Sequence, residues 1–330
     1  MLYARLRMLF DNFTIALLVI IALATILPPV GQGVPFFENL TYIAIALLFF
    51  FHGAKLPRSA VIAGVTHWRL HLLIFVFTFL VFPALGLLLK PFLAPLVNDQ
   101  LYMGVLFLCA LPATVQSAIA FTAMARGNVA AAVASASASS LIGIFLTPLL
   151  VNLMLDAQGS AGSFWEAVWA IVIQLLVPFV GGQVARRWIG EWVQRHGAKL
   201  KYIDQGSILL VVYTAFGAAV VEGLWHTVTY MELAGLFVLC CILLAIVLVL
   251  SANMAKRFGF NKEDQITIVF CASKKSLATG VPMAKVIFAA HLVGPMLLPL
   301  MIFHQLQLMV CAVLAQRYAQ RPEEVLSTAS

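Results

Sequence analysis

Two adjacent lysines, Lys274 and Lys275, lie in the middle of an apolar stretch of this 330-residue sequence. A charged side chain at the centre of a membrane helix costs about 2.5 to 3.5 kcal/mol on insertion scales, so such residues mark functional sites. The stretch begins near Gln265, and a rise of about 1.5 Å per residue puts both lysines near the middle of a 30 Å core. The alternative is one lysine that snorkels to the headgroups from a shifted helix.

Acidic partners for these lysines are missing from the sequence around them. We expect all 13 Asp and Glu residues at helix ends or in loops. A buried ammonium without a carboxylate must lose its proton, take carbonyl and hydroxyl ligands, or bind an anion. The absence of intramembrane carboxylates argues against a cation channel and against a carboxylate-based proton antiporter.

Two apolar segments carry polar residues and helix breakers at mid-span. The first has Pro112 followed by Ala-Thr-Val-Gln-Ser, and the second has Ser273 to Ser276 followed by Gly280 and Pro282. Proline removes a backbone donor and clashes with the preceding turn. Interrupted segments at equivalent places in two inverted halves point to a transport site, with half-helix N-termini that favour an anion. Ordinary proline kinks are the alternative.

Hydroxyl groups and a histidine extend this candidate site. Ser135, Ser137, Ser139 and Ser140 form either a row of ligands or a small-residue packing face, and His304 serves either a substrate or a hydrogen bond between helices. The candidate substrate- and ion-binding residues are Thr114, Gln116, Ser117, Ser137, Ser140, Ser273, Lys274, Lys275, Ser276 and His304.

The composition is that of a membrane protein, with 63% hydrophobic residues, 10% charged residues and a mean hydropathy of +1.02. A helix needs roughly 20 apolar residues to cross the hydrocarbon. We therefore predict an all-α membrane protein, with no soluble domain and with five free cysteines. Its ten predicted spans are 13–30, 39–54, 70–89, 101–125, 128–152, 165–185, 205–225, 232–254, 265–288 and 293–316.

The distribution of basic residues predicts the orientation. Loops on the side of the N-terminus hold 16 of the 20 Lys and Arg residues, and the other side holds Lys90 and Lys285. Positive loops face the cytoplasm, so both termini are expected there, in a multi-pass protein of the cell membrane. The net charge of +7 thus reflects contact with the lipid bilayer and does not indicate nucleic-acid binding.

Ten spans divide into two halves of five, and an odd number per half requires an inverted repeat. Residues 116–126 and 275–285 share serines, a Met-Ala pair and a closing basic residue at an offset of 159. We predict one domain over 1–330, with repeats at about 10–155 and 163–318 and a cytosolic tail at 319–330. Because the sequence has no recognisable catalytic motif, an enzyme such as an intramembrane hydrolase is the weaker alternative.

The sequence resembles the bile acid:sodium symporter superfamily, in the branch of the member 7-type carriers and their bacterial relatives. The resemblance rests on residues 111–148, with an Ala-Arg-Gly-Asn turn and a hydroxyl-rich helix, and on residues 271–288. It implies a core domain of helices 3–5 and 8–10, a panel domain of helices 1, 2, 6 and 7, and broken helices 4 and 9 that cross. Transport would follow alternating access between the two domains.

The resemblance also implies a sodium site, with Gln116, Ser117, Ser137 and Ser140 at the matching positions. Aligning a Gln-Asn pair of the family with the two lysines puts Phe270 where the family has a sodium-binding glutamate. We expect a transporter of an organic anion, coupled to Na⁺ or H⁺, in which a lysine acts as a tethered cation among serine hydroxyls and broken-helix carbonyls. A carrier-like regulator of ion homeostasis without bulk transport is the alternative.

Overall fold

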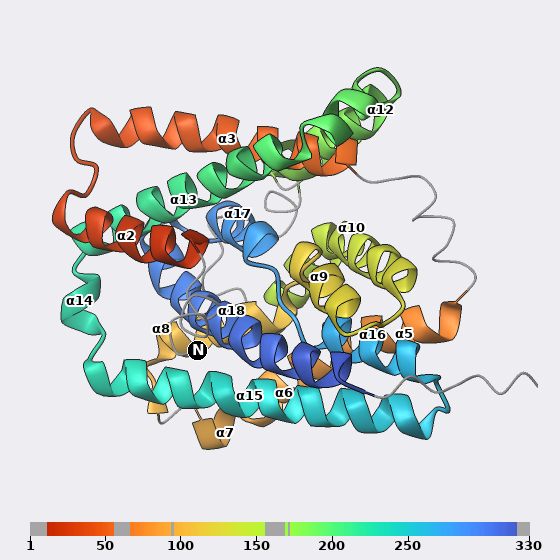
Figure 1. Ribbon diagram of the computed structural model, residues 1–330. Coiled ribbons are helices and arrows are strands. Elements are labelled where there is room, and N and C mark those ends of the chain that lie inside the picture. Colours follow the sequence, from red (N-terminus) through yellow and green to blue (C-terminus); the bar gives the residue numbers. More distant parts are fainter. Residues whose placement is uncertain (1–11, 56–66, 94–95, 156–168, 171, 322–330) are drawn as a thin grey trace, which may run out of the picture.

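The computed structural model describes residues 12–55, 67–93, 96–155, 169–170 and 172–321, which form helices (Figure 1). The helices of the first half are α2 (Asn12–Ile26), α3 (Gly33–Lys55), α5 (Trp68–Val76), the π-helix η1 (Phe77–Val81), α6 (Phe82–Leu88), α7 (Lys90–Leu93), α8 (Asp99–Ala110), α9 (Gln116–Met124) and α10 (Val129–Met154). Those of the second half are the π-helix η3 (Val172–Leu176), α12 (Val177–Arg195), α13 (Gly197–Val221), α14 (Leu224–Thr227), α15 (Tyr230–Arg257), α16 (Lys262–Ala272), α17 (Leu277–Ile287) and α18 (Ala290–Ala319).

Six of the described helices are long and apolar enough to cross a membrane. They are 33–55, 68–92, 129–154, 197–221, 230–257 and 290–319. The all-helical, multi-pass character predicted from the composition is therefore confirmed. The five cysteines are free, as predicted, although Cys241 is only half-buried.

The bounds of α12 and α13 differ from the predicted spans. α12 continues to Arg195 and α13 begins at Gly197, whereas the predicted spans end at 185 and begin at 205. Hydropathy ends a span at the first charged residues, but Arg, Lys, Glu and Gln are good helix formers. The helices therefore extend through the charged sequence, and Asp204 becomes the eighth residue of α13.

Both segments with helix breakers are interrupted. The first is divided between α8 and α9, and the second between α16 and α17. The two interruptions meet: the Ser276 N–H donates to Pro112 O at 3.0 Å, and Thr114 Oγ1 donates to Lys275 O at 3.1 Å. Backbone groups freed in one interruption are thus satisfied by the other, as burial requires.

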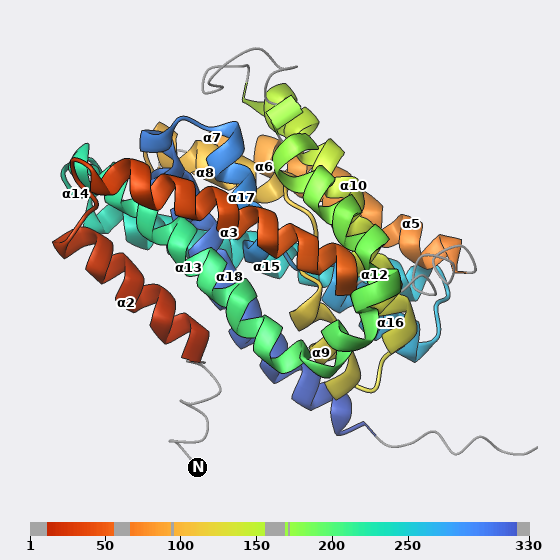
Figure 2. The same cartoon turned by 90° about the horizontal axis from the view of Figure 1, so that it is seen from above.

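Helices α2, α3, α12 and α13 lie together along one edge of the molecule, and α15 lies along the opposite edge (Figures 1 and 2). α3 and α12 are in backbone contact, because a Cβ at Gly53 would overlap Phe179 O and one at Gly182 would overlap Phe50 O. Small residues at such crossings allow close helix packing in membranes. α9, α10, α17 and α18 lie between the two edges.

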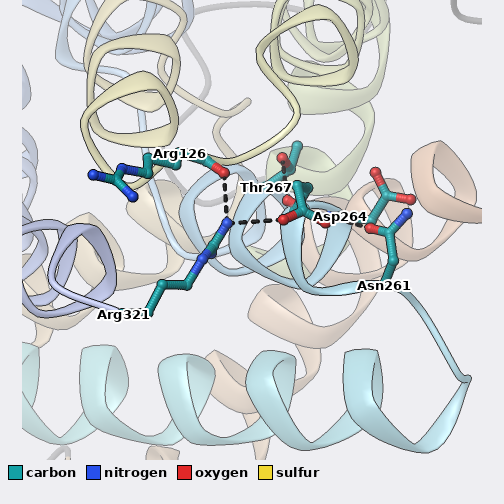
Figure 3. Close-up of polar contacts among 6 residues, drawn as sticks. Arg126, Asn261, Asp264, Thr267 and Arg321 are labelled. Atoms are coloured by element: carbon teal, nitrogen blue, oxygen red, sulfur yellow. Dashed lines mark hydrogen bonds and ion pairs between the residues drawn. The ribbon is translucent and has the colours of Figure 1, made fainter. Parts of the chain in front are cut away.

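The turn between α9 and α10 is fixed to α16 and α18 by polar contacts (Figure 3). Arg126 has a left-handed φ of 55°, and its carbonyl accepts from Arg321 Nη2, which also pairs with Glu263. Asn128 Nδ2 donates to Asp264 Oδ1 at 2.9 Å. The Arg-Gly-Asn segment is therefore a tight turn, as predicted, and it ties four helices together at one end of the bundle.

Candidate functional site

Lys275 is fully buried, and its ammonium is saturated by backbone carbonyls. Nζ donates to Thr78 O and Cys109 O at 2.8 Å each and to Leu111 O at 2.7 Å. The ring of Phe82 lies 4.1 Å from Nζ. An ammonium has three donors, so three carbonyls from two other segments satisfy it completely. The serine hydroxyls that we expected around a lysine are absent from this set.

Each of these carbonyls is free for a local reason. In the π-helix each N–H donates five residues back, as the N–H of Phe82 does to Phe77 O. The donor for Thr78 O would therefore be residue 83, which is Pro83 and has no N–H. α8 ends at Ala110, and the N–H of Ala113 donates to Ser139 Oγ, so Cys109 O and Leu111 O lack helical donors. Lys275 thus caps the end of α8 and the π-helix at once.

The side chain of Gln307 satisfies both backbone groups of Lys275 in the second interruption. Its Oε1 accepts from the Lys275 N–H at 2.8 Å and its Nε2 donates to Lys275 O at 2.9 Å, as a neighbouring peptide group would. Nε2 also lies 2.9 Å from His304 Nδ1. The hydrogen-bonding role that we expected between helices thus applies to Gln307, and His304 is held beside it.

Lys274 is also fully buried but has different surroundings. Its Nζ lies 3.9 Å from the ring centroid of Phe121 and 5.8 Å from that of Phe270. No carbonyl or hydroxyl group of the described residues accepts from it. The two neighbouring lysines therefore point apart, one into carbonyls and one against aromatic rings.

Two adjoining cavities, of about 220 and 350 Å³, lie between the α3, α12 and α13 group and helices α9, α10, α17 and α18. His52, Gln116, Ser140 and Thr279 line both. The smaller cavity has an apolar wall that includes Phe49 and Phe179. Their lining suits a ligand with one polar and one apolar side.

The cavities bring together seven of the ten candidate residues. These are Thr114, Gln116, Ser117, Ser137, Ser140, Ser276 and His304. Neither lysine lines a cavity, and Ser273 Oγ instead donates to Val269 O within its own helix. The hydroxyls of Ser117, Ser140 and Thr279 are buried and have no hydrogen-bond partner among the described residues. Buried hydroxyls are normally paired, so these are available to a ligand.

The serines of α10 divide between two faces. Ser135 Oγ lies 2.6 Å from His71 Nδ1 and Ser139 Oγ accepts from Ala113, so this pair is structural. Ser137 and Ser140 face the cavities. The packing reading of the serine row therefore fits Ser135 and Ser139, and the ligand reading stays a prediction for Ser137 and Ser140.

Two helix N-termini open into the larger cavity. α9 begins at Gln116 after Val115, which provides no side-chain cap, and α17 begins at Leu277, where Ser276 Oγ accepts from the Thr279 N–H at 3.2 Å. Gln116, Ser117 and Leu277 all line this cavity. Helix N-termini carry a partial positive charge and exposed N–H groups, so this is an anion-binding environment.

Sequence reasoning missed an ion pair at the boundary of the cavities. Lys55 Nζ pairs with Asp204 Oδ2, and the side chains are 27% and 6% exposed. The expectation that every acidic residue lies in a loop or at a helix end is therefore wrong for Asp204. Asp204 stands four residues from both Leu200 and Ile208, two buried apolar residues of α13. This helical spacing is the sequence feature that could have predicted its burial.

Comparisons with known proteins match nearly the whole chain. The SBF-like CPA transporter family matches residues 11–320. An uncharacterized protein of Pseudomonas aeruginosa is 65% identical over 97% of this chain and 96% of its own length. The putative symporter YfeH of Escherichia coli is 58% identical over 96% of this chain and 95% of its own length. Sodium/bile acid cotransporter 7 of Mus musculus is 31% identical over 92% of this chain and 90% of its own length.

Proposed function

Because this chain belongs to the SBF-like CPA transporter family, in the bile acid:sodium symporter superfamily, we propose that it is a secondary active transporter of an organic anion. The observation that carries the substrate class is the pair of helix N-termini, of α9 and α17, that open into one cavity with unpaired hydroxyls. A carboxylate or sulfonate would bind there, and its apolar body would contact Phe49 and Phe179.

We propose for this transporter ten spans in two inverted repeats, with both termini in the cytoplasm of a cell-membrane protein. The core domain would comprise α5 to α10 and α15 to α18, and the panel domain α2, α3, α12 and α13. Two features support this division: the interruptions of α8/α9 and α16/α17 meet, and the cavities lie between the two groups of helices. Relative motion of the groups would expose the anion site alternately to the two sides of the membrane.

Coupling does not require sodium in this proposal, because Lys275 acts as a tethered cation. A sodium ion prefers oxygen ligands such as carbonyls, and three carbonyls converge on the Lys275 ammonium. The position expected for a sodium-binding glutamate is Phe270, which packs edge-on against Tyr318 in an apolar cluster. The positive charge of a protonated Lys275 in the carbonyl cage would replace the charge of a bound ion.

Residual sodium coupling is the second candidate, and a specific observation favours it. Ser117 and Ser140 have buried, unpaired hydroxyls beside Gln116, and Ser137 lies on the same cavity wall. These groups are neutral oxygen ligands of the kind that a sodium ion takes, and the carboxylate of Asp204 lines the larger cavity with three of the four. Sodium as a co-transported ion would then bind next to the substrate anion.

Uptake into proteoliposomes tests both versions. The wild-type protein would be offered radiolabelled acetate, phenylacetate and cholate, with sodium or choline as the outside cation. Accumulation in choline supports the tethered-cation version, and accumulation only in sodium supports the second candidate. No accumulation of any anion by folded protein would favour a carrier-like regulator of ion homeostasis.

A further inference from the structure

The Lys55–Asp204 ion pair lines the two cavities in which we propose that an organic anion binds. Lys55 lines the smaller cavity with Gln116, Ser137 and Thr279, and Asp204 lines the larger one. The pair therefore bridges the two spaces that the substrate would fill. This inference rests on the proposed transport of an organic anion.

Only one oxygen of Asp204 is used. Oδ2 accepts from Lys55, but Oδ1 is buried without a hydrogen-bond partner among the described residues. A buried carboxylate oxygen without a donor is costly when the group is ionised. The same oxygen is a ready position for a proton, because a protonated carboxyl needs fewer donors than a carboxylate.

Charge balance then links the anion to a proton. In the absence of substrate, the ammonium of Lys55 and the carboxylate of Asp204 neutralise each other. A substrate carboxylate that approaches Lys55 adds a second negative charge next to Asp204, and like charges at short range in a poorly solvated site repel strongly. Protonation of Asp204 removes that repulsion and releases Lys55 to the substrate.

We propose that Asp204 takes up one proton when an organic anion replaces it on Lys55, so that this cavity binds a proton and an anion together. Before binding, the ion pair consists of one ammonium and one carboxylate, and the exposed Lys201 lines the larger cavity in both states. After binding, the Lys55 ammonium, the substrate anion and a neutral carboxylic acid take the place of the pair, and the net charge of these groups is zero in both states. The proton comes from water on the entry side and leaves with the anion on the other side.

The other titratable groups around Asp204 define the controls. α3 contributes His52 and Lys55, α13 itself contributes Lys201, and α18 contributes His304, whereas α2 presents Phe13 to the same cavity. His52 is the rival proton acceptor, because its ring lines both cavities. Its Nδ1–H donates to Leu48 O at 2.9 Å, so Nε2 is the nitrogen that could take up a proton.

Calorimetric titration in two buffers of different ionisation enthalpy counts the protons bound with each anion. The probe is whichever of acetate, phenylacetate and cholate the wild-type protein binds most tightly. We expect one proton per anion and a dissociation constant that rises about tenfold per pH unit on the alkaline side. Asp204→Asn should bind the probe with no proton uptake and no pH dependence, and His52→Gln should still take up one proton.

Two further variants separate this exchange from a structural ion pair. Lys55→Arg keeps the cation and should retain the proton count. Glu191→Gln neutralises the exposed partner of Arg195 on α12 and should behave as wild type. Anion binding without proton uptake, or proton uptake that persists in Asp204→Asn, would overturn the exchange and leave anion transport standing. Failure of the wild-type protein to bind any probe would overturn the proposed substrate class and this inference with it.

Discussion

The strongest stability prediction contrasts two neighbouring lysines. Replacing Lys275 by Met removes the donors of Thr78 O, Cys109 O and Leu111 O in a region from which water is excluded. Each unsatisfied carbonyl costs about 1 to 3 kcal/mol, so the gross loss is about 3 to 9 kcal/mol. Removing the ammonium returns part of its desolvation penalty, which leaves a net loss of about 3 to 5 kcal/mol.

Lys274→Met is the matched control. Its ammonium contacts the rings of Phe121 and Phe270 and serves no carbonyl or hydroxyl group of the described residues. A methionine thioether also packs well against aromatic rings, and the lost cation–π contact is worth about 0.5 to 2 kcal/mol. The gain from removing a buried charge offsets that loss, so we expect a change within about 1 kcal/mol.

Thermal unfolding in detergent measures both variants. At about 2 °C per kcal/mol, Lys275→Met should lower the apparent Tm by about 6 to 10 °C and Lys274→Met by no more than about 2 °C. The reasoning fails if Lys274→Met is destabilised as much as Lys275→Met. It also fails if Lys275→Met unfolds at the wild-type temperature, because the three carbonyls would then have needed no donor.

Lys275→Gln should abolish or decouple transport but still insert into the membrane; strict sodium dependence of the wild-type protein, with this variant fully active, would rule out the tethered cation. Gly182→Leu should separate α12 from α3 and lower the apparent Tm, whereas the same change at Gly197, which has no neighbour within 4 Å, should not. Arg321→Ala should cost at most about 1 kcal/mol, because its partner Glu263 is half exposed, and a larger loss would show that the carbonyl of Arg126 depends on it. Reporter fusions should place residues 60 and 190 in the cytoplasm, and an external signal at either would contradict the predicted orientation.

Local sequence features were enough to locate the interruptions and seven of the residues that line the cavities. Pro112 and the Ser273 to Ser276 segment lie in the two interruptions, although Pro148 and Pro282 lie inside α10 and α17. Thr114, Gln116 and Ser117 follow Pro112 directly in the sequence. The division of the α10 serines also follows from helical geometry, because positions three or four residues apart share a face. Ser135 and Ser139 share one face, and Ser137 and Ser140 share the other.

The partners of the lysines were beyond such reasoning. The carbonyl cage around Lys275 depends on Pro83, which lies in a different helix and leaves Thr78 O without a donor. It also depends on the Ala113 N–H, which donates to Ser139 Oγ and so is not available to Cys109 O. These contacts join three segments that are far apart in the sequence, so no local sequence pattern could predict them. Asp204 was missed for a different reason, because hydropathy placed the start of its helix eight residues too late.

The two buried lysines are not the source of the positive potential in the cavities, contrary to the expectation from the sequence. The charge of Lys275 is balanced by the dipoles of three carbonyls, and that of Lys274 by aromatic faces, so neither is presented to the cavities. The positive groups that line the cavities are the N-termini of α9 and α17, the partly exposed Lys55 and the exposed Lys201. Partial charges at helix ends attract an anion without requiring a buried counter-charge when the site is empty. Lys55 does require one, and Asp204 supplies it. Lys275 therefore stabilises the meeting point of the broken helices, and in the proposed function the anion would be recognised by the two helix N-termini and by cations that line the cavities.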